Sequence, residues 1–325
     1  MHRFDSKKKM KKRIALVTGC AGFIGSNLVD KLLNKKYIVY GIDNFRTGSF
    51  KNLKNAFKNK NFYFKKLDLT QKNKLSKVFN NKIDIIFHIA ANADVRRGYL
   101  DPSNDLKYNT ILTFNILEQM RKKGIKKIVF CSTGSIYGET KDIPTPENTK
   151  FPIQTSMYGA SKLACEGLLQ SYSEAYKIKS YIFRFVSILG PRYSHGHVID
   201  FFNKLKKNKR TLNVLGDGNQ KKSYLHVNDC INGIFRALNY HNKNLINIYN
   251  LGNNNFISVK QSIKIIINFL KLKPNIKFQN KRRGWIGDVP FILLDTKKIK
   301  KTGWTPKYSI KESIIDTLKF LIDEK

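Results

Sequence analysis

The stretch that decides the fold reads Leu16-Val17-Thr18-Gly19-Cys20-Ala21-Gly22-Phe23-Ile24-Gly25. An apolar run at residues 13–17 leads into it and is typical of a buried parallel strand. Behind it, leucines recur at helical spacing through residues 25–36. The stretch is therefore predicted to form the turn between a buried strand and a helix.

The three glycines of this turn suit a bound dinucleotide. Gly19 permits the tight turn, Gly22 lets the backbone approach a pyrophosphate, and Gly25 lets the helix pack on the strand. Free N–H groups at the start of the helix would then face the phosphates. The glycine spacing alone is a weak signal, since an ordinary strand–turn–helix can also carry it.

An acidic residue further along the chain makes the signal more specific. A second strand, predicted at residues 37–42, is followed by Asp43, about twenty residues after the glycines. A carboxylate at this place holds the ribose hydroxyls of NAD. Because it also repels a 2′-phosphate, the sequence predicts NAD as the cofactor rather than NADP.

The chain of 325 residues carries a formal net charge of +38, which raises the question of nucleic-acid binding. Its basic residues are mostly lysines and are spread along the whole chain. No helix-turn-helix, RNA-recognition or zinc pattern is present. We interpret the charge as compositional drift on solvated faces and expect no nucleic-acid partner. Attraction of an anionic nucleotide substrate is a secondary effect of the same charge.

The composition also bears on membrane association, on the N-terminal segment and on metal binding. No apolar run approaches the length of a membrane span, so we expect no membrane association. Residues 1–12 are basic and lack an apolar stretch, so we expect a disordered tail and not a signal peptide. Four scattered cysteines show no metal-ligand spacing, which favours reduced thiols in a cytoplasmic enzyme without a metal: Cys20, Cys131, Cys165 and Cys230.

Apolar runs and helical patterns alternate up to residue 186. Further strands are predicted at residues 61–67, 83–89, 127–131 and 180–185. Helices are predicted at residues 71–80, 104–123 and 158–176. This alternation predicts an α/β fold with a doubly wound parallel (Rossmann) sheet, whose ligands bind at the carboxyl ends of the strands.

The alternation of strands and helices changes after residue 186, where glycine- and asparagine-rich turns separate shorter predicted elements. We predict an NAD-binding domain at residues 13–186, to which part of 224–250 returns. Residues 187–325 are predicted to form a smaller α/β domain that binds the substrate.

A tyrosine and a lysine four residues apart are candidates for catalysis. Tyr158 and Lys162 would share one face of a helix, where the ammonium favours the phenolate form of the tyrosine. The same spacing occurs at Tyr137 and Lys141, so the pattern alone is unspecific. Tyr137 precedes a segment broken by prolines, whereas Tyr158 opens a helix with Ala164, Leu168 and Leu169 on its expected apolar side. We therefore prefer Tyr158 as the base.

Hydroxyl residues come directly after the strand at 127–131. Ser132, Thr133 and Ser135 are predicted to lie in a loop, and a hydroxyl there could hydrogen-bond the substrate oxygen that Tyr158 deprotonates. An ordinary Ser/Thr turn is an equally acceptable explanation of this segment alone.

Together these motifs resemble the extended short-chain dehydrogenase/reductase family, in particular its NAD-dependent nucleotide-sugar epimerases and dehydratases. The resemblance spans nearly the whole chain and also includes Leu67-Asp68-Leu69, Phe87-His88-x-Ala90-Ala91, Asn109 and Gly190-Pro191-Arg192. It implies that Tyr158, Lys162 and Thr133 are catalytic. It further implies cofactor contacts for Gly19, Gly22, Phe23, Ile24, Gly25, Asp43, Asn44, Asp68, Leu69, Ala90, Ala91, Asn92, Asn109, Ser132, Tyr158, Lys162 and Phe185.

The same resemblance implies a binding site for a nucleotide sugar in the later third of the chain. Lys222 takes the place of an arginine that usually touches the diphosphate, and Ser187 takes the place of a usual asparagine. The substrate-binding residues implied are Val95, Thr133, Ser187, Lys222, Arg282 and Arg283.

The two residues directly after Thr133 indicate the reaction. The related 4,6-dehydratases carry an Asp-Glu pair there and the sugar-acid decarboxylases a Glu, whereas this chain has Gly134 and Ser135. Without an added acid or base, the 4-keto sugar turns and takes the hydride back on its other face. The resemblance therefore implies 4-epimerisation with NAD recycled.

Several alternatives stay open. A UDP-hexose of the glucose/galactose type is the expected substrate, and a UDP-N-acetylhexosamine or a CDP- or dTDP-sugar is the alternative. A net oxidoreductase or a non-catalytic NAD-sensing protein would use the same site, although intact Tyr158, Lys162 and Thr133 disfavour a sensor. A homodimer packed through residues 104–123 and 158–176 is expected by analogy.

Overall fold

Seven short strands pair into one parallel sheet, in the order β11-β6-β5-β4-β1-β2-β3. Its strands are β1 (Ile14–Thr18), β2 (Ile38–Asp43), β3 (Phe62–Lys66), β4 (Ile85–His88), β5 (Lys127–Thr133), β6 (Lys179–Phe185) and β11 (Ile246–Leu251). The order reverses between β1 and β4, and α/β sheets open a ligand crevice at such a point. The predicted α/β class with a doubly wound parallel sheet is confirmed.

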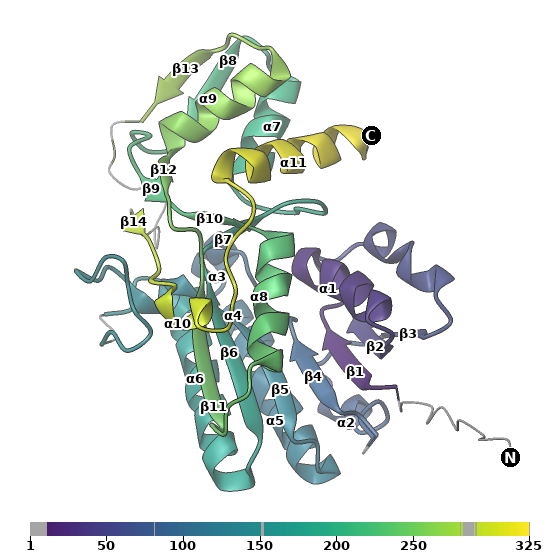
Figure 1. Ribbon diagram of the computed structural model, residues 1–325. Coiled ribbons are helices and arrows are strands. Elements are labelled where there is room, and N and C mark those ends of the chain that lie inside the picture. Colours follow the sequence, from purple (N-terminus) through teal and green to yellow (C-terminus); the bar gives the residue numbers. More distant parts are fainter. Residues whose placement is uncertain are drawn as a thin grey trace, which may run out of the picture.

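The computed structural model describes residues 12–80, 82–150, 153–279, 281, 289 and 291–324 (Figure 1). The predicted tail up to residue 11 and the predicted diphosphate contacts Arg282 and Arg283 lie outside the described residues. No helix among the described residues is long and apolar enough to cross a membrane.

Alternate residues of each central strand point to opposite faces, and helices cover both. On one face, Leu16, Ile128 and Ile182 pack with residues of α5 (Leu112–Lys123) and α6 (Met157–Tyr176). On the other, their neighbours pack with α1 (Phe23–Asn34) and α8 (Val227–Asn239). Figure 1 shows the two helix layers on either side of the sheet. The strands are thus buried on both sides, which explains their continuous apolar runs.

Helix boundaries differ from the prediction in two places. The helix predicted at residues 71–80 is a single turn, α2 (Lys72–Leu75). The one predicted at residues 104–123 begins with α4 (Ser103–Asp105) and continues through a π-helical turn, η3 (Leu106–Ile111), into α5. A period-3.6 pattern cannot reveal a turn with wider hydrogen bonding. Short elements complete this part: η1 (Phe50–Leu53), η2 (Ala56–Lys58), α3 (Val95–Leu100) and η4 (Gly134–Tyr137).

Two further expectations were wrong at the level of single residues. Ser132 and Thr133 belong to strand β5 and not to the loop after it. Ala164, expected on the apolar side of α6, is exposed, whereas Leu168 and Leu169 pack against the core as predicted. The buried side of α6 also carries polar groups, among them Ser161, Lys162 and Glu166. The helix is therefore oriented by polar contacts as well as by apolar packing.

The later third of the chain builds small sheets and helices beyond the carboxyl ends of the central strands. In Figure 1, α7 (His197–Lys207), α9 (Val259–Leu270) and α11 (Ile310–Asp323) lie together there, and the three are in contact. The small sheets are β7 (Ser187–Leu189) with β10 (Tyr224–His226), β8 (Thr211–Val214) with β13 (Asn275–Phe278), and β9 (Lys221–Lys222) with β12 (Ile257–Ser258) and β14 (Phe291–Ile292); α10 (Lys297–Lys300) precedes α11. The boundary between the two predicted domains stays a prediction.

The close approach of α1 to the turn before it gives a first testable prediction. A Cβ placed on Gly25 would lie 2.0 Å from the carbonyl oxygen of Gly19, so the helix would have to move. Gly25→Ala is expected to cost about 3 kcal/mol or more in the free energy of unfolding, measured by urea denaturation. The control is Gly167→Ala in α6, where a Cβ meets nothing within 4 Å. That change should raise stability by about 0.5–1 kcal/mol, and equal destabilisation by both variants would contradict the argument.

Candidate active site

Two adjoining cavities open at the carboxyl ends of the central strands. The first, of about 460 Å³, runs along the glycine turn and the ends of β2, β3 and β4. The second, of about 360 Å³, lies between the ends of β5 and β6 and the elements of the later third. Both are lined by Phe23, Ile24, Ala93, Asp94 and His195, so they form one continuous cleft.

The first cavity is shaped to accept a dinucleotide. Gly19 has a left-handed φ of +68°, and a Cβ on it would lie 2.7 Å from the backbone of Ala90. Gly22 is the N-cap of α1 and has no side chain to cap the first N–H groups of this helix, whose first residues line the cavity. Such an uncapped helix start can bind an anion. The residues therefore fit a pyrophosphate cradle.

Asp43 lies at the end of β2 in the first cavity, as predicted. Its carboxylate accepts hydrogen bonds from the N–H groups of Ala21 (2.9 Å) and Phe45 (2.8 Å), and burial raises its pKa. Asn44 donates from its side chain to Asp68 (3.2 Å), which joins the ends of β2 and β3. These bonds fix the carboxylate at the place where a ribose would sit.

Buried hydrogen bonds behind the first cavity hold its wall, the segment after β4. Thr18 accepts the N–H groups of Ile89 and Ala90, and its hydroxyl hydrogen-bonds His88 (2.9 Å). Burial lowers the pKa of His88 to about 3, so the ring is neutral. Asn109 accepts the N–H of Asn92 (2.8 Å) through its side-chain carbonyl. Asn109 is buried and lines neither cavity, so it supports the wall and does not form it.

The predicted catalytic residues meet at the second cavity. Thr133 and Tyr158 line it, and the hydroxyl of Thr133 hydrogen-bonds the phenol. Lys162 lies one turn along α6, is buried, and donates to the carbonyl of Cys131 (2.8 Å). Burial raises the pKa of Tyr158, which the hydrogen bond to Thr133 opposes, and burial lowers the pKa of Lys162. The phenol is therefore a base only when nearby positive charge stabilises its anion.

Tyr137, the alternative tyrosine, does not reach the cleft. It ends the short helix η4, so Lys141 does not share a helical face with it, as predicted. Its hydroxyl is buried between Arg184 (2.6 Å) and the side chain of Asn250 (2.9 Å). Burial raises its pKa to about 12. The structure thus favours Tyr158 over Tyr137 as the base.

Most of the remaining predicted residues line the cleft. Those at the first cavity are Gly19, Gly22, Phe23, Ile24, Gly25, Asp43, Asn44, Asp68, Leu69, Ala90, Ala91 and Asn92. Those at the second cavity are Val95, Ser132, Thr133, Tyr158, Phe185, Ser187 and Lys222. Lys222 also donates to the carbonyl of Val289. The contacts of these residues with bound molecules stay predictions.

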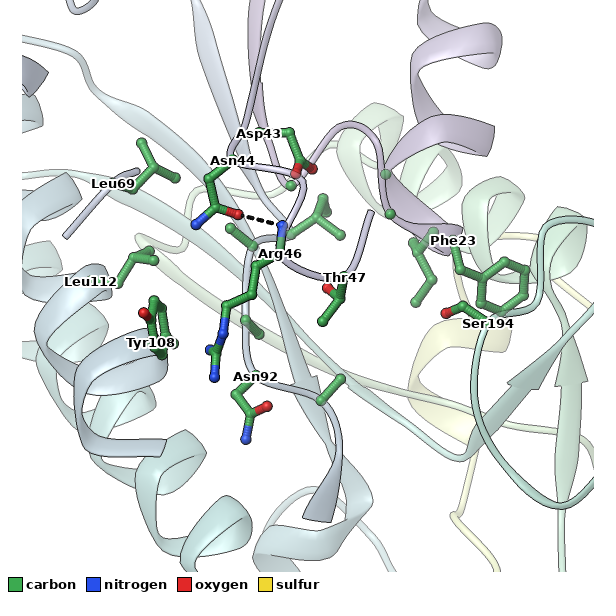
Figure 2. Close-up of a pocket in the computed structure, with 18 of the residues that line it drawn as sticks. Phe23, Asp43, Asn44, Arg46, Thr47, Leu69, Asn92, Tyr108, Leu112 and Ser194 are labelled. Carbon is green, nitrogen blue, oxygen red and sulfur yellow. Dashed lines mark hydrogen bonds between the residues drawn. The ribbon is translucent and has the colours of Figure 1, made fainter. Parts of the chain in front are cut away.

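Sequence reasoning missed several residues of the cleft. Arg46 lines the first cavity and stacks on Tyr108 at 3.8 Å (Figure 2). Its guanidinium also donates to Asn104. Thr47, Leu112 and Ser194 also line this cavity, and His197, Asp200 and Lys204 line the second. Within the described residues, no group of three or more His, Cys, Asp or Glu side chains is placed to hold a metal ion.

The chain matches the model of the NAD dependent epimerase/dehydratase family over residues 15–252. It belongs to that family. Its resemblance to the nucleotide-sugar epimerases is thereby confirmed at the level of the family, and the chain is an NAD-dependent epimerase.

Individual relatives cover almost the whole chain of this epimerase. A Methanocaldococcus jannaschii protein provisionally named UDP-glucose 4-epimerase is 35% identical, over 92% of this chain and 95% of its own. A UDP-glucuronate 4-epimerase from Thermodesulfobacterium geofontis is 30% identical, over 94% and 95% of the two chains. The solved structure of UDP-glucose 4-epimerase with UDP-glucose from Thermotoga maritima is 30% identical with a TM-score of 0.85, covering 96% of this chain and 99% of that one.

The bridge made by Arg46 gives a testable prediction for this NAD-dependent epimerase. The guanidinium spans from the loop after β2 to the helical segment 103–112 beside the first cavity (Figure 2). A cation–π contact of this kind contributes about 0.5–1 kcal/mol and a hydrogen bond about as much. Arg46→Ala is therefore expected to speed the dissociation of NAD by roughly fivefold, measured by stopped-flow displacement.

The matched control is Arg121→Ala on α5. Arg121 also pairs with an aromatic ring, that of Tyr176 at 5.5 Å, but lines neither cavity. An unchanged dissociation rate in Arg46→Ala, or an equal change in both variants, would refute the role of the bridge.

Proposed function

We propose that this chain interconverts the C4 epimers of a UDP-hexose of the glucose/galactose type. The proposal depends above all on one observation: Thr133 and Tyr158 line the second cavity, which is continuous with the dinucleotide cavity, and the buried Lys162 lies one helical turn from Tyr158. The bound cofactor would supply a hydride acceptor with a positively charged ring beside this group of residues. The relatives named above support the same substrate class.

Tyr158 takes the proton of the C4 hydroxyl in this proposal and later returns it. Moving a phenol pKa from about 10 to about 7 needs roughly 4 kcal/mol of differential stabilisation. Burial works against that change, so the ammonium of Lys162 must supply part of the stabilisation. Thr133 hydrogen-bonds Tyr158 and thereby holds the phenol oxygen at the substrate.

The surroundings of Thr133 favour epimerisation over elimination. Gly134 and Ser135 come directly after it, so this stretch brings hydroxyls but no carboxylate to the reacting sugar. Two carboxylates line the second cavity elsewhere: Asp94, directly before α3, and Asp200 in α7. Each of them already interacts with another group of the protein. A 4-keto sugar that meets no carboxylate from the stretch after Thr133 can turn and be reduced on its other face.

We place the diphosphate at the basic end of the second cavity. Lys222 and Lys204 line it, and Arg282 and Arg283 are assigned to the same diphosphate as a prediction. His197 stacks on Tyr224, and burial together with Lys222 lowers the pKa of its ring to about 3. The positive charge at this end of the cavity therefore comes from lysines and not from this histidine.

A homodimer is part of the proposal. Apolar side chains are exposed along η3, α5 and the start of α6, among them Leu106 (55%), Ile111 (43%), Phe114 (38%) and Met157 (54%). Figure 1 shows α5 and α6 on the same side of the sheet. Pairing of this face with a second copy would bury them. A cytoplasmic location stays a prediction.

The substrate is tested by incubating the purified protein with UDP-glucose and no added cofactor. UDP-galactose is expected, identified by chromatography, with little lasting absorbance of reduced nicotinamide. Stoichiometric accumulation of reduced nicotinamide would instead show a net oxidoreductase. The rates of epimerisation of UDP-N-acetylhexosamine, UDP-glucuronate, CDP-sugars and dTDP-sugars then show which sugar and which nucleotide base the enzyme prefers.

The base is tested by Tyr158→Phe. Removal of the phenol oxygen is expected to lower kcat by about a thousandfold, because general-base catalysis contributes roughly 10²–10⁴-fold, while bound NAD is retained. Nucleotide content is measured by chromatography after denaturation. The control is Tyr172→Phe on the same helix, whose hydroxyl donates to Glu118 away from the cleft. Near-normal turnover in Tyr158→Phe would remove Tyr158 as the base.

A further inference from the structure

Directly behind the catalytic residues lies a buried ion pair that touches neither cavity. Arg184 on β6 donates from its terminal nitrogen to Glu166 on α6 at 2.8 Å and from Nε to both carboxylate oxygens at 3.1 and 3.3 Å. The side chains are 2% and 1% exposed. Since neither residue lines the cleft, neither is placed to contact cofactor or substrate.

The pair is linked to the end of β5, where Thr133 stands. Glu166 accepts a hydrogen bond from the hydroxyl of Ser132 at 2.5 Å. One turn earlier on the same helix, Lys162 donates to the carbonyl of Cys131 at 2.8 Å. Two successive turns of α6 thus hold two successive residues of β5, immediately before Thr133.

The other terminal nitrogen of Arg184 is also hydrogen-bonded. It donates to the hydroxyl of Tyr137 (2.6 Å) and to the carbonyl of Glu147 (2.9 Å). Tyr137 donates in turn to Asn250 at the end of β11. The side chain of Asn250 donates to the carbonyls of Thr145 and Asp295. The pair and the hydrogen bonds around it therefore link side chains of β5, β6, β11 and α6.

Stability does not explain why charges are used here. Removing two charges from water is costly, and apolar residues of similar volume often replace a buried ion pair with no loss of stability. What apolar side chains cannot supply is a fixed direction for the hydroxyl of Ser132 and for the guanidinium. Directional bonds are needed where a small displacement of Thr133 against Tyr158 would slow the chemistry.

We propose that Glu166 and Arg184 are positioning residues of the reaction: their ion pair fixes Ser132 and thereby holds Thr133 in place against Tyr158. The proposal rests on the epimerase function proposed above. Tyr137, the second tyrosine of the Tyr-x-x-x-Lys pattern, belongs to this positioning network and not to the catalytic group.

The test replaces the whole pair by apolar side chains, in the double variant Glu166→Leu with Arg184→Met. Each single change would leave a buried charge without its partner, whereas the double change leaves none. The double variant is expected to unfold within a few degrees of the parent protein. Its kcat for the interconversion of UDP-glucose and UDP-galactose should fall on the order of 100-fold, with KM within threefold and NAD content unchanged.

The matched control is Ser173→Ala with Ser180→Ala. These serines lie on the same helix and strand as the ion pair, α6 and β6, and share a buried hydrogen bond of 2.8 Å. Because they lie far along both elements from Thr133, their loss should leave kcat within threefold of the parent value. A double variant of the ion pair that keeps the parent kcat would overturn the proposal, as would an equal fall in the control.

If the double variant does not fold, the single variant Tyr137→Phe tests the positioning role instead. It removes only the hydroxyl that Arg184 and Asn250 share, and kcat is expected to fall about tenfold with KM unchanged. An unchanged kcat would overturn the proposal. If the parent protein itself makes no UDP-galactose, the proposed function is wrong. If the parent is active and the variants are equally active, only the positioning role is wrong.

Discussion

The site depends on an ammonium group that the fold keeps out of water. Lys162 is 3% exposed, and an isolated buried cation is among the most costly groups a protein can hold. Burial lowers the pKa of Lys162, and three features oppose this effect: the carbonyl of Cys131 at 2.8 Å, the ring of Phe130 at 4.6 Å, and the carboxylates of Glu166 and Asp105. A tyrosine can act as a base beside this charge. The packing of β5 against α6 keeps the tyrosine and the lysine close together.

Much of this arrangement could be predicted from the sequence, because parallel strands buried on both faces read as continuous apolar runs. The glycine turn, Asp43 and the helix that begins near Tyr158 are local patterns, and the structure has all three at the expected places. Since the carboxyl ends of parallel strands share one edge, residues as distant as Asp43 and Tyr158 could be expected to meet at one cleft.

The features that could not be predicted depend on contacts between distant segments. Ala164 fits an apolar stripe by spacing, yet it is exposed, since the sheet side of α6 is occupied by Lys162 and Glu166. Asn109 matches a family motif but lies behind the cavity wall, where it is part of the π-helical turn η3 and accepts the N–H of Asn92. Arg46 has no signal of its own, since only the fold brings it beside Tyr108.

The position of β3 at the edge of the sheet gives part of the lysine excess a physical use. An edge strand offers unpaired N–H and C=O groups to any other strand, and large parallel sheets form slowly enough to expose such edges during folding. In β3 the exposed Tyr63 would invite such pairing, whereas Lys65 and Lys66 are also exposed and repel a second copy of the same edge. Charge that looks like mere drift in composition thus acts, at this edge, as protection against self-association.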